Sequence, residues 1–147
     1  MSEAALRILL VAVGGAAGSV CRYLCSGYVA RGVATLTGGG LGTGAAALDY
    51  PWGTTVVNLV GSLLFGVIWA AFGREGSTLW KVFLLGGFLG AFTTFSTFMF
   101  ETVHLLDKGR PLAALANLLL QNVAGVILVF IGLALGSALC GRWGHTT

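Results

Sequence analysis

The chain has 147 residues, of which 56% are hydrophobic and only 9% are charged, and its mean hydropathy is +0.92. Soluble globular domains carry about 25% charged residues, so this composition excludes that class and indicates a membrane protein. The formal net charge of +3 comes without a basic cluster, and we therefore expect no nucleic-acid partner.

Four windows are long and apolar enough to cross a bilayer, because a spanning helix needs about 20 residues of low charge. They cover about 5–28, 52–72, 79–106 and 112–139. The first begins almost at the N-terminus and resembles the other three in length, so we do not expect a cleaved signal peptide. We predict a single all-α transmembrane domain covering residues 1–147.

The junction between the first two windows is the longest. Residues 31–50 are rich in Gly, Ala and Thr and contain three consecutive glycines at 38–40, and Pro51 follows. This composition predicts a flexible loop. At the last junction, Pro111 is well placed to start the final helix.

Basic residues are almost equally divided between the two sides of the membrane. One side holds Arg7, Arg74, Lys81 and Arg142, and the other holds Arg31, Lys108 and Arg110. If Arg22, in the distal part of the first span, is counted with the second side, each side holds four basic residues. Because an excess of Lys and Arg normally marks the cytoplasmic side, this balance predicts insertion in both orientations and an antiparallel homodimer. The alternative is that one strong charge decides the orientation.

The first span combines a small-residue surface with an unusual charge. Gly14 and Gly18 are four residues apart, a spacing that favours close helix contact. Arg22 is costly inside a span unless its guanidinium reaches an interface, a water-filled vestibule or a carboxylate. We consider both an anion-attracting role and simple snorkelling to the interface.

Polar side chains recur at helical spacing in the second and fourth spans. Thr54, Asn58 and Ser62 share one face of the second span, and Asn117 and Gln121 share one face of the fourth. These residues predict a polar track along a pore. The alternative is that they only form hydrogen bonds between helices.

In the third span, glycines 86, 87 and 90 precede Thr93 and Thr94. Glycine lowers helix propensity, so we predict a helix break near Gly90–Thr94. The carbonyl groups freed by such a break can coordinate a small cation without an acidic side chain.

Aromatic and hydroxyl side chains follow the predicted break. Phe95 and Phe98 stand three residues apart on one face, with Ser96 and Thr97 turned away from it. Aromatic rings carry a partly positive edge, so two ring edges facing a pore could attract a dehydrated anion. The alternative is a phenylalanine-rich packing or lipid face.

Several function classes find no support in the sequence. All five acidic residues lie at predicted span ends or in loops, which argues against a proton-coupled cation antiporter. Neither histidine has a nucleophile or metal partner at a recognisable spacing, so we expect no enzymatic activity. The cysteines suit apolar packing better than a metal site. These residues are Glu3, Asp49, Glu75, Glu101 and Asp107; His104 and His145; and Cys21, Cys25 and Cys140.

Three segments together carry a family resemblance. GGAAGSVCRY at 14–23, GTTVVNLVGS at 53–62 and GFLGAFTTFSTF at 87–98 resemble the signature segments of the bacterial fluoride channel family, Fluc, also called CrcB. The resemblance implies a multi-pass protein of the bacterial inner membrane that exports fluoride passively. It also implies an antiparallel dual-topology homodimer with two fluoride pores at its interface and a structural Na⁺ at its centre.

The resemblance also implies roles for individual residues. Asn58 is similar to the family's pore asparagine, Phe95 and Phe98 to its pore-lining rings, and the Gly90 and Thr93 carbonyls to its Na⁺ ligands. The full set expected to line the fluoride pore is Thr54, Asn58, Ser62, Phe95, Ser96, Thr97, Phe98, Asn117 and Gln121, with Arg22 and Glu101 at the vestibule.

The fourth span departs from the family pattern. Asn117 and Gln121 stand where the family commonly has a tyrosine and, four residues later, a serine. Two other functions remain open: a small multidrug-type proton-coupled transporter, and a membrane assembly subunit that transports nothing.

Overall fold

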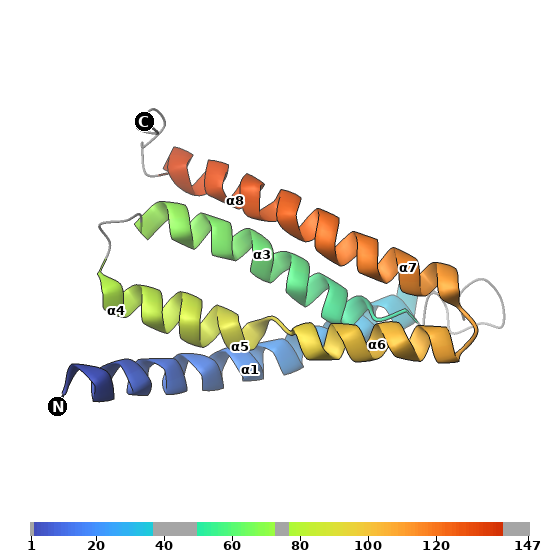
Figure 1. Ribbon diagram of the computed structural model, residues 1–147, viewed down its shortest axis with the longest axis horizontal. Coiled ribbons are helices and arrows are strands. Elements are labelled where there is room, and N and C mark those ends of the chain that lie inside the picture. Colours follow the sequence, from blue (N-terminus) through green and yellow to red (C-terminus); the bar gives the residue numbers. More distant parts are fainter. Residues whose placement is uncertain (1, 37–49, 73–76, 140–147) are drawn as a thin grey trace.

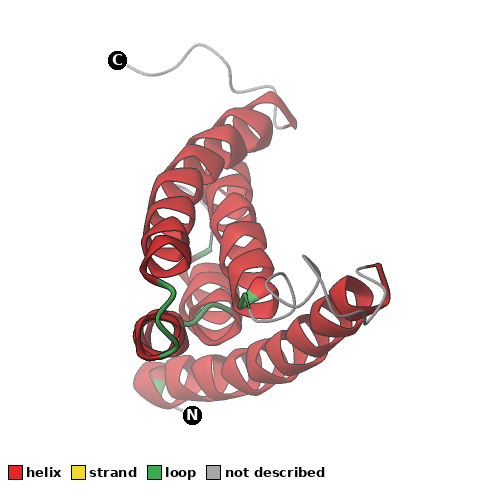
Figure 2. Ribbon diagram, turned by 90° about the vertical axis from the view of Figure 1, so that its right-hand side faces the viewer, coloured by secondary structure: helices red, strands yellow, loops and turns green. Residues whose placement is uncertain are grey.

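The computed structural model describes residues 2–36, 50–72 and 77–139. Within these ranges every regular element is a helix, and four helical segments are long and apolar enough to cross a membrane. They lie roughly side by side in Figure 1 and splay apart when viewed from the end in Figure 2. The predicted four-span, multi-pass membrane architecture is confirmed. The segments are Glu3–Leu36, Trp52–Phe72, Thr78–Asp107 and Pro111–Leu139.

Helix α1 (Glu3–Leu36) is longer than predicted. Its last turns occupy the start of the expected loop, so the boundary at Arg31 was wrong. The single glycine there, Gly32, is too weak a signal to end a helix without a following proline. Arg31 also lies 4.9 Å over the ring of Tyr28, and the Thr35 hydroxyl donates to the Arg31 carbonyl. The rest of the expected loop, residues 37–49, lies outside the described residues.

The third span consists of four helical pieces with one interruption. Its first half is α-helical only briefly and then π-helical up to Leu89, which the sequence did not predict. The chain becomes extended at Thr93 (φ −82°, ψ 160°) and Thr94 (φ −148°, ψ 119°). The break predicted within Gly90–Thr94 is therefore confirmed, but Gly90 itself is helical. The pieces are α4 (Thr78–Lys81), η1 (Val82–Leu89), α5 (Gly90–Phe92) and α6 (Phe95–Asp107).

The fourth span also contains a π-helical turn. It comprises α7 (Pro111–Leu119), η2 (Leu120–Ala124) and α8 (Gly125–Leu139), and Pro111 opens the first turn as predicted. Gly109, with φ +68°, makes the tight turn from α6. Short π-helical insertions often mark functional positions, and η2 contains Gln121.

Glycine contacts hold the spans together. Gly14 and Gly18 of α1 are buried, and a methyl group at Gly14 would lie 2.6 Å from the carbonyl oxygen of Phe83 in η1. A methyl group at Gly18 would meet the carbonyl oxygen of Phe88. The close helix contact predicted from their spacing is confirmed. Helix α3 (Trp52–Phe72) approaches α8 in the same way.

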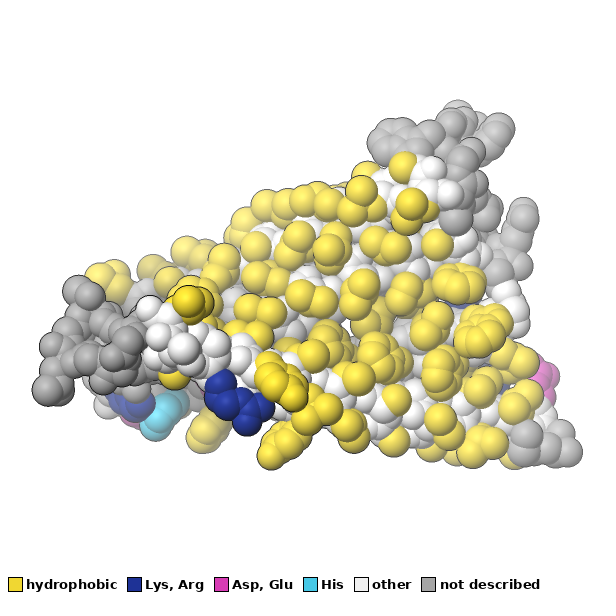
Figure 3. All heavy atoms as spheres, turned by 180° about the vertical axis from the view of Figure 1, so that it is seen from behind, with side chains coloured by type: hydrophobic (Ala, Val, Ile, Leu, Met, Phe, Trp, Pro, Cys, Tyr) yellow, Lys and Arg dark blue, Asp and Glu magenta, His cyan; other side chains and the backbone are white. Residues whose placement is uncertain are grey.

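Apolar side chains cover the outside of the protein. They dominate the face shown in Figure 3, where charged groups are few. Only seven hydrophobic residues are buried in the described part of the chain, and four of them form a cluster beside the break: Val57, Leu85, Leu89 and Phe92. Because lipid tails are as apolar as leucine, helix association in a bilayer depends on close packing and interhelical hydrogen bonds more than on apolar burial.

A methyl group at Gly18 should loosen the contact between α1 and η1. We expect Gly18→Ala to lower the stability by about 1–3 kcal/mol, because the added carbon overlaps backbone atoms of Phe88. The control is Gly32→Ala in the same helix, where nothing lies within 4 Å of the added carbon. Thermal unfolding of the purified protein in detergent measures both, and equal midpoints would contradict the packing role.

Candidate functional site

The helix break is closed by one side chain from a neighbouring span. Asn58 of α3 accepts a hydrogen bond from the Thr94 backbone N–H through Oδ1, at 2.8 Å, and donates to the Thr94 carbonyl through Nδ2, at 3.0 Å. The amide thus pairs with both polar groups of one extended residue. An unpaired backbone group in hydrocarbon costs several kcal/mol, so Asn58 makes the break possible.

The pairing also changes the local backbone bonds. In a continuous helix the Thr94 N–H would donate to the Gly90 carbonyl, but here it donates to Asn58. The Thr94 hydroxyl then caps the next helix, accepting from the Thr97 N–H at 3.3 Å. Gly61 of α3 leaves room for the Thr93 methyl group. The break follows from these contacts more than from the glycines before it.

Arg22 reaches the same break from α1. Its guanidinium donates to the Thr93 carbonyl, with an Nη1–O distance of 3.2 Å. The group is therefore placed by a specific contact, not by snorkelling alone. It also lines a cavity of about 230 Å³ between α1 and the break, together with Ser19, Tyr23, Ser26, Thr54, Thr94 and Thr97.

A chain of buried amides continues from Asn58 into the fourth span. Asn58 Nδ2 donates to Gln121 Oε1 at 2.7 Å, and Gln121 Nε2 donates to Asn117 Oδ1 at 2.8 Å. Asn117 Nδ2 donates to the Thr102 hydroxyl at 2.9 Å, which donates to the Phe98 carbonyl at 2.8 Å. Asn117 is fully buried and Gln121 is 8% exposed. Asn58 of the second span thus meets Asn117 and Gln121 of the fourth in one network, which we call the amide chain.

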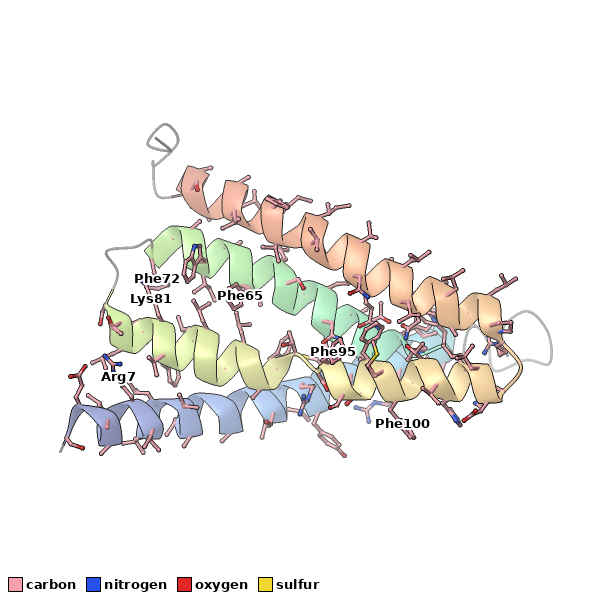
Figure 4. The ribbon with its side chains drawn as sticks, viewed as in Figure 1. Arg7, Phe65, Phe72, Lys81, Phe95 and Phe100 are labelled. Atoms are coloured by element: carbon pink, nitrogen blue, oxygen red, sulfur yellow. The ribbon has the colours of Figure 1, made fainter. Side chains whose placement is uncertain are left out.

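Two phenylalanine rings stand beside the amide chain. The Phe95 and Phe98 centroids are 5.9 Å apart, with the ring planes inclined at 67°. Phe98 is buried, whereas Phe95 is 71% exposed. Both line a cavity of about 350 Å³, which we call the break cavity, together with Asn58, Ser62, Gly90, Thr93, Thr94 and Gln121. Figure 4 shows Phe95 at the start of α6, with Phe100 projecting from a different face of that helix.

Not all predicted pore residues line this cavity. The Thr54 hydroxyl donates to Glu101 Oε1 at 2.7 Å. Thr54, Thr97 and Glu101 border a different cavity of about 410 Å³, with Ser26 and Tyr50. Burial raises the pKa of the Tyr50 hydroxyl, so this group stays protonated near neutral pH and adds no negative charge to that cavity. Thr54 therefore borders a different cavity from Asn58 and Ser62, although the three share one face of α3.

The two serines predicted to line the pore differ in their placement. Ser62 donates to the Asn58 carbonyl at 2.8 Å, within its own helix, and Ser96 is exposed. Three residues that we did not predict as site residues also contribute: Thr55, Thr94 and Thr102. Thr55 accepts from Gln121 Nε2 at 3.3 Å. Thr94 was expected only as part of the helix break, and the signal of Thr55 and Thr102 is a hydroxyl within an apolar span, which does not identify a partner.

A cation at this site would depend on carbonyl oxygens. Within the described residues, no group of three or more His, Cys, Asp or Glu side chains could hold a metal ion. Gly90 and Thr93 line the break cavity, and the Gly90 carbonyl has lost its usual helix donor to Asn58. Carbonyl oxygens are hard ligands, so this donor set suits Na⁺. The Thr93 carbonyl also accepts from Arg22.

The sequence matches a known protein family over most of its length. The profile of the family described as CrcB-like protein, Camphor Resistance (CrcB), matches residues 9–133. The chain belongs to the CrcB family. A protein of Solidesulfovibrio magneticus named fluoride-specific ion channel FluC is 46% identical over 129 residues, or 86% of this chain and 92% of that protein.

Other CrcB-family relatives are similar over most of their length. A Salinibacter ruber protein of the same name is 39% identical over 92% of this chain and 93% of its own. Fluoride-specific ion channel FluC 2 of Natronomonas pharaonis is 43% identical over 92% of this chain and 99% of its own. The resemblance stated from three short motifs is therefore confirmed along nearly the whole sequence.

Removing the amide of Asn58 should destabilise the break. Asn58→Leu leaves the Thr94 N–H and carbonyl without their partner, and we expect a loss of about 2–4 kcal/mol. Asn122→Leu is the matched control, because the Asn122 amide is exposed and donates to Leu118 in its own helix. Thermal unfolding in detergent compares the two, and equal losses would contradict the role of Asn58.

Proposed function

We propose that this protein is a fluoride-selective passive channel of the plasma membrane. The observation that carries the proposal is the break cavity, which brings the Asn58 amide and the Phe95 and Phe98 rings together at a helix break between the spans. The names of its relatives, fluoride-specific ion channel, support the same conclusion. The activity is transport and not enzymatic catalysis.

The cavity offers what a small anion needs. Fluoride is compact and strongly hydrated, so a selective path must replace its water with close donors. Asn58 supplies an amide N–H donor, and the two rings can present partly positive edges. A larger anion would lose its water without meeting the same donors at equally short distance. This difference is the proposed origin of selectivity.

The proposed channel is an antiparallel homodimer with two pores. Phe95 belongs to the break cavity yet is 71% exposed in one chain. A second copy of opposite orientation would cover it and close the path on its open side. The balance of basic residues across the predicted junctions supports this dual topology.

A structural Na⁺ is proposed at the dimer centre. The Gly90 and Thr93 carbonyls of both copies would hold it, and the ion would supply a positive charge that bridges the subunits. One chain offers only two of these carbonyl oxygens, whereas two copies together would offer four to a cation that prefers oxygen ligands. Arg22, which bonds the same Thr93 carbonyl, would orient that oxygen and add positive potential near the vestibule.

Passive flow is sufficient for export. In acid surroundings the neutral conjugate acid of fluoride crosses the membrane, releases its proton inside and leaves the anion trapped. A channel then lets the anion leave down its own gradient. We propose this protective role for the protein.

Four further residues have proposed places in the pore. Arg22 and Glu101 would lie near its mouths, and Thr54 and Thr97 would lie along it.

Substitution of the cavity residues should slow fluoride transport. We expect Asn58→Asp and Phe95→Ile to reduce fluoride efflux from proteoliposomes by about tenfold or more, as for the loss of a contact to a charged group. Phe100→Ile is the control, because Phe100 is equally exposed but projects from another face of α6. A fluoride electrode measures efflux, and a chloride electrode measures selectivity.

The same assay separates the alternatives. Unchanged fluoride efflux in both variants would contradict the assignment of the pore. Proton-dependent efflux of lipophilic cations would instead indicate a multidrug-type transporter. Absence of any ion flux from the purified wild-type protein would leave only a membrane assembly subunit.

Removal of Na⁺ should weaken the dimer. A ligand that binds only the folded assembly raises its stability with concentration. We therefore expect a higher unfolding temperature and a larger dimer fraction in sodium chloride than in choline chloride of equal ionic strength. Size-exclusion chromatography and thermal unfolding measure both quantities. Identical behaviour in the two salts would contradict the proposed ion.

A further inference from the structure

The amide of Asn58 has no spare donor in one chain. An amide nitrogen carries two hydrogens, and Asn58 Nδ2 already donates to the Thr94 carbonyl and to Gln121 Oε1. The orientation of this amide is unambiguous, because the Thr94 backbone N–H can only donate and must face Oδ1. An anion that binds Asn58 must therefore displace one of two acceptors.

The two acceptors are not equally easy to displace. The contact with Thr94 is reciprocal, so breaking it would also disturb a backbone group at the helix break. The contact with Gln121 is a single bond between side chains, at 2.7 Å. Gln121 also lines the break cavity together with Phe95 and Phe98. Gln121 Oε1 is the acceptor that an anion in this cavity can replace.

The other end of Gln121 is anchored. Its Nε2 donates to Asn117 Oδ1 at 2.8 Å and to the Thr55 hydroxyl at 3.3 Å. Both amide hydrogens are thus occupied, which leaves Gln121 no donor of its own for an anion. Anchoring at Nε2 also holds Oε1 near Asn58, so the bond can re-form as soon as an anion leaves.

We propose that Gln121 is an internal acceptor that competes with fluoride for the Asn58 N–H and thereby sets the affinity of the pore. This inference rests on the proposed function and changes the role predicted for Gln121 from an anion contact to a positioning residue. The competing oxygen weakens anion binding and speeds release, since Asn58 regains a partner when the anion departs.

The test is the dependence of fluoride efflux on fluoride concentration in proteoliposomes. Gln121→Met keeps the length of the side chain but removes the competing oxygen. We expect the half-saturating fluoride concentration to fall about fivefold, equivalent to one ordinary hydrogen bond, and the maximal efflux rate to fall as well. A merely structural defect would lower the maximal rate without tightening binding.

Two further variants keep the test decisive. Gln121→Met leaves the buried Asn117 Oδ1 without its hydrogen-bond donor, which could cause misfolding. The double variant Gln121→Met with Asn117→Leu removes that acceptor as well and so guards against this defect. It should show the same fall in half-saturating concentration. Leu119→Met introduces the same side chain at an exposed position of α7 that does not line the break cavity, and should not lower the half-saturating concentration.

The outcomes distinguish the two proposals. A half-saturating concentration that stays unchanged or rises in both Gln121 variants, while the wild type conducts fluoride, would overturn the role of Gln121 alone. A wild-type protein that carries no fluoride would overturn the proposed function and this inference together. A fall in both Gln121 variants but not in Leu119→Met supports the competition.

Discussion

The pairing of Asn58 with Thr94 is the interaction on which the rest of the structure depends. A helix that crosses a bilayer has no water to satisfy its backbone, so an interruption needs a partner for each freed polar group. One amide provides an acceptor and a donor at 2.8 and 3.0 Å from the same residue. The extended backbone at Thr93 and Thr94, the cap of α6 and the cavity beside them all require this contact.

The same contact links stability to function. Asn58 closes the break, lines the break cavity and begins the amide chain through Gln121 and Asn117. A substitution at Asn58 therefore changes folding and transport at once, and transport data need a stability measurement beside them. Substitutions at Phe95 and Gln121 separate the two more cleanly, because the Thr94 backbone is hydrogen-bonded to Asn58 and not to either of these side chains.

Close backbone contact holds this framework in place where apolar burial is small. The contact of α1 with η1 at Gly14 and Gly18 brings Arg22 to the Thr93 carbonyl, and the contact of α3 with α8 brings Asn58 toward Gln121. The exposed ring of Phe95 shows where this arrangement is open in a single chain. The proposed second copy would complete the site there.

The sequence by itself determined the four spans, the break near Gly90–Thr94, the close contact at Gly14 and Gly18, and the family. The spans, the glycine contact and the family depend on local composition, spacing and motifs, and the glycines indicated where the break lies, although the contact with Asn58 is what stabilises it. Only the tertiary structure decided that α1 continues to Leu36, that Thr54 and Asn58 border different cavities, and that Gln121 accepts from Asn58. Helical spacing shows which side chains share a face, but the hydrogen-bond partner of each one is set by the neighbouring helix that packs against it.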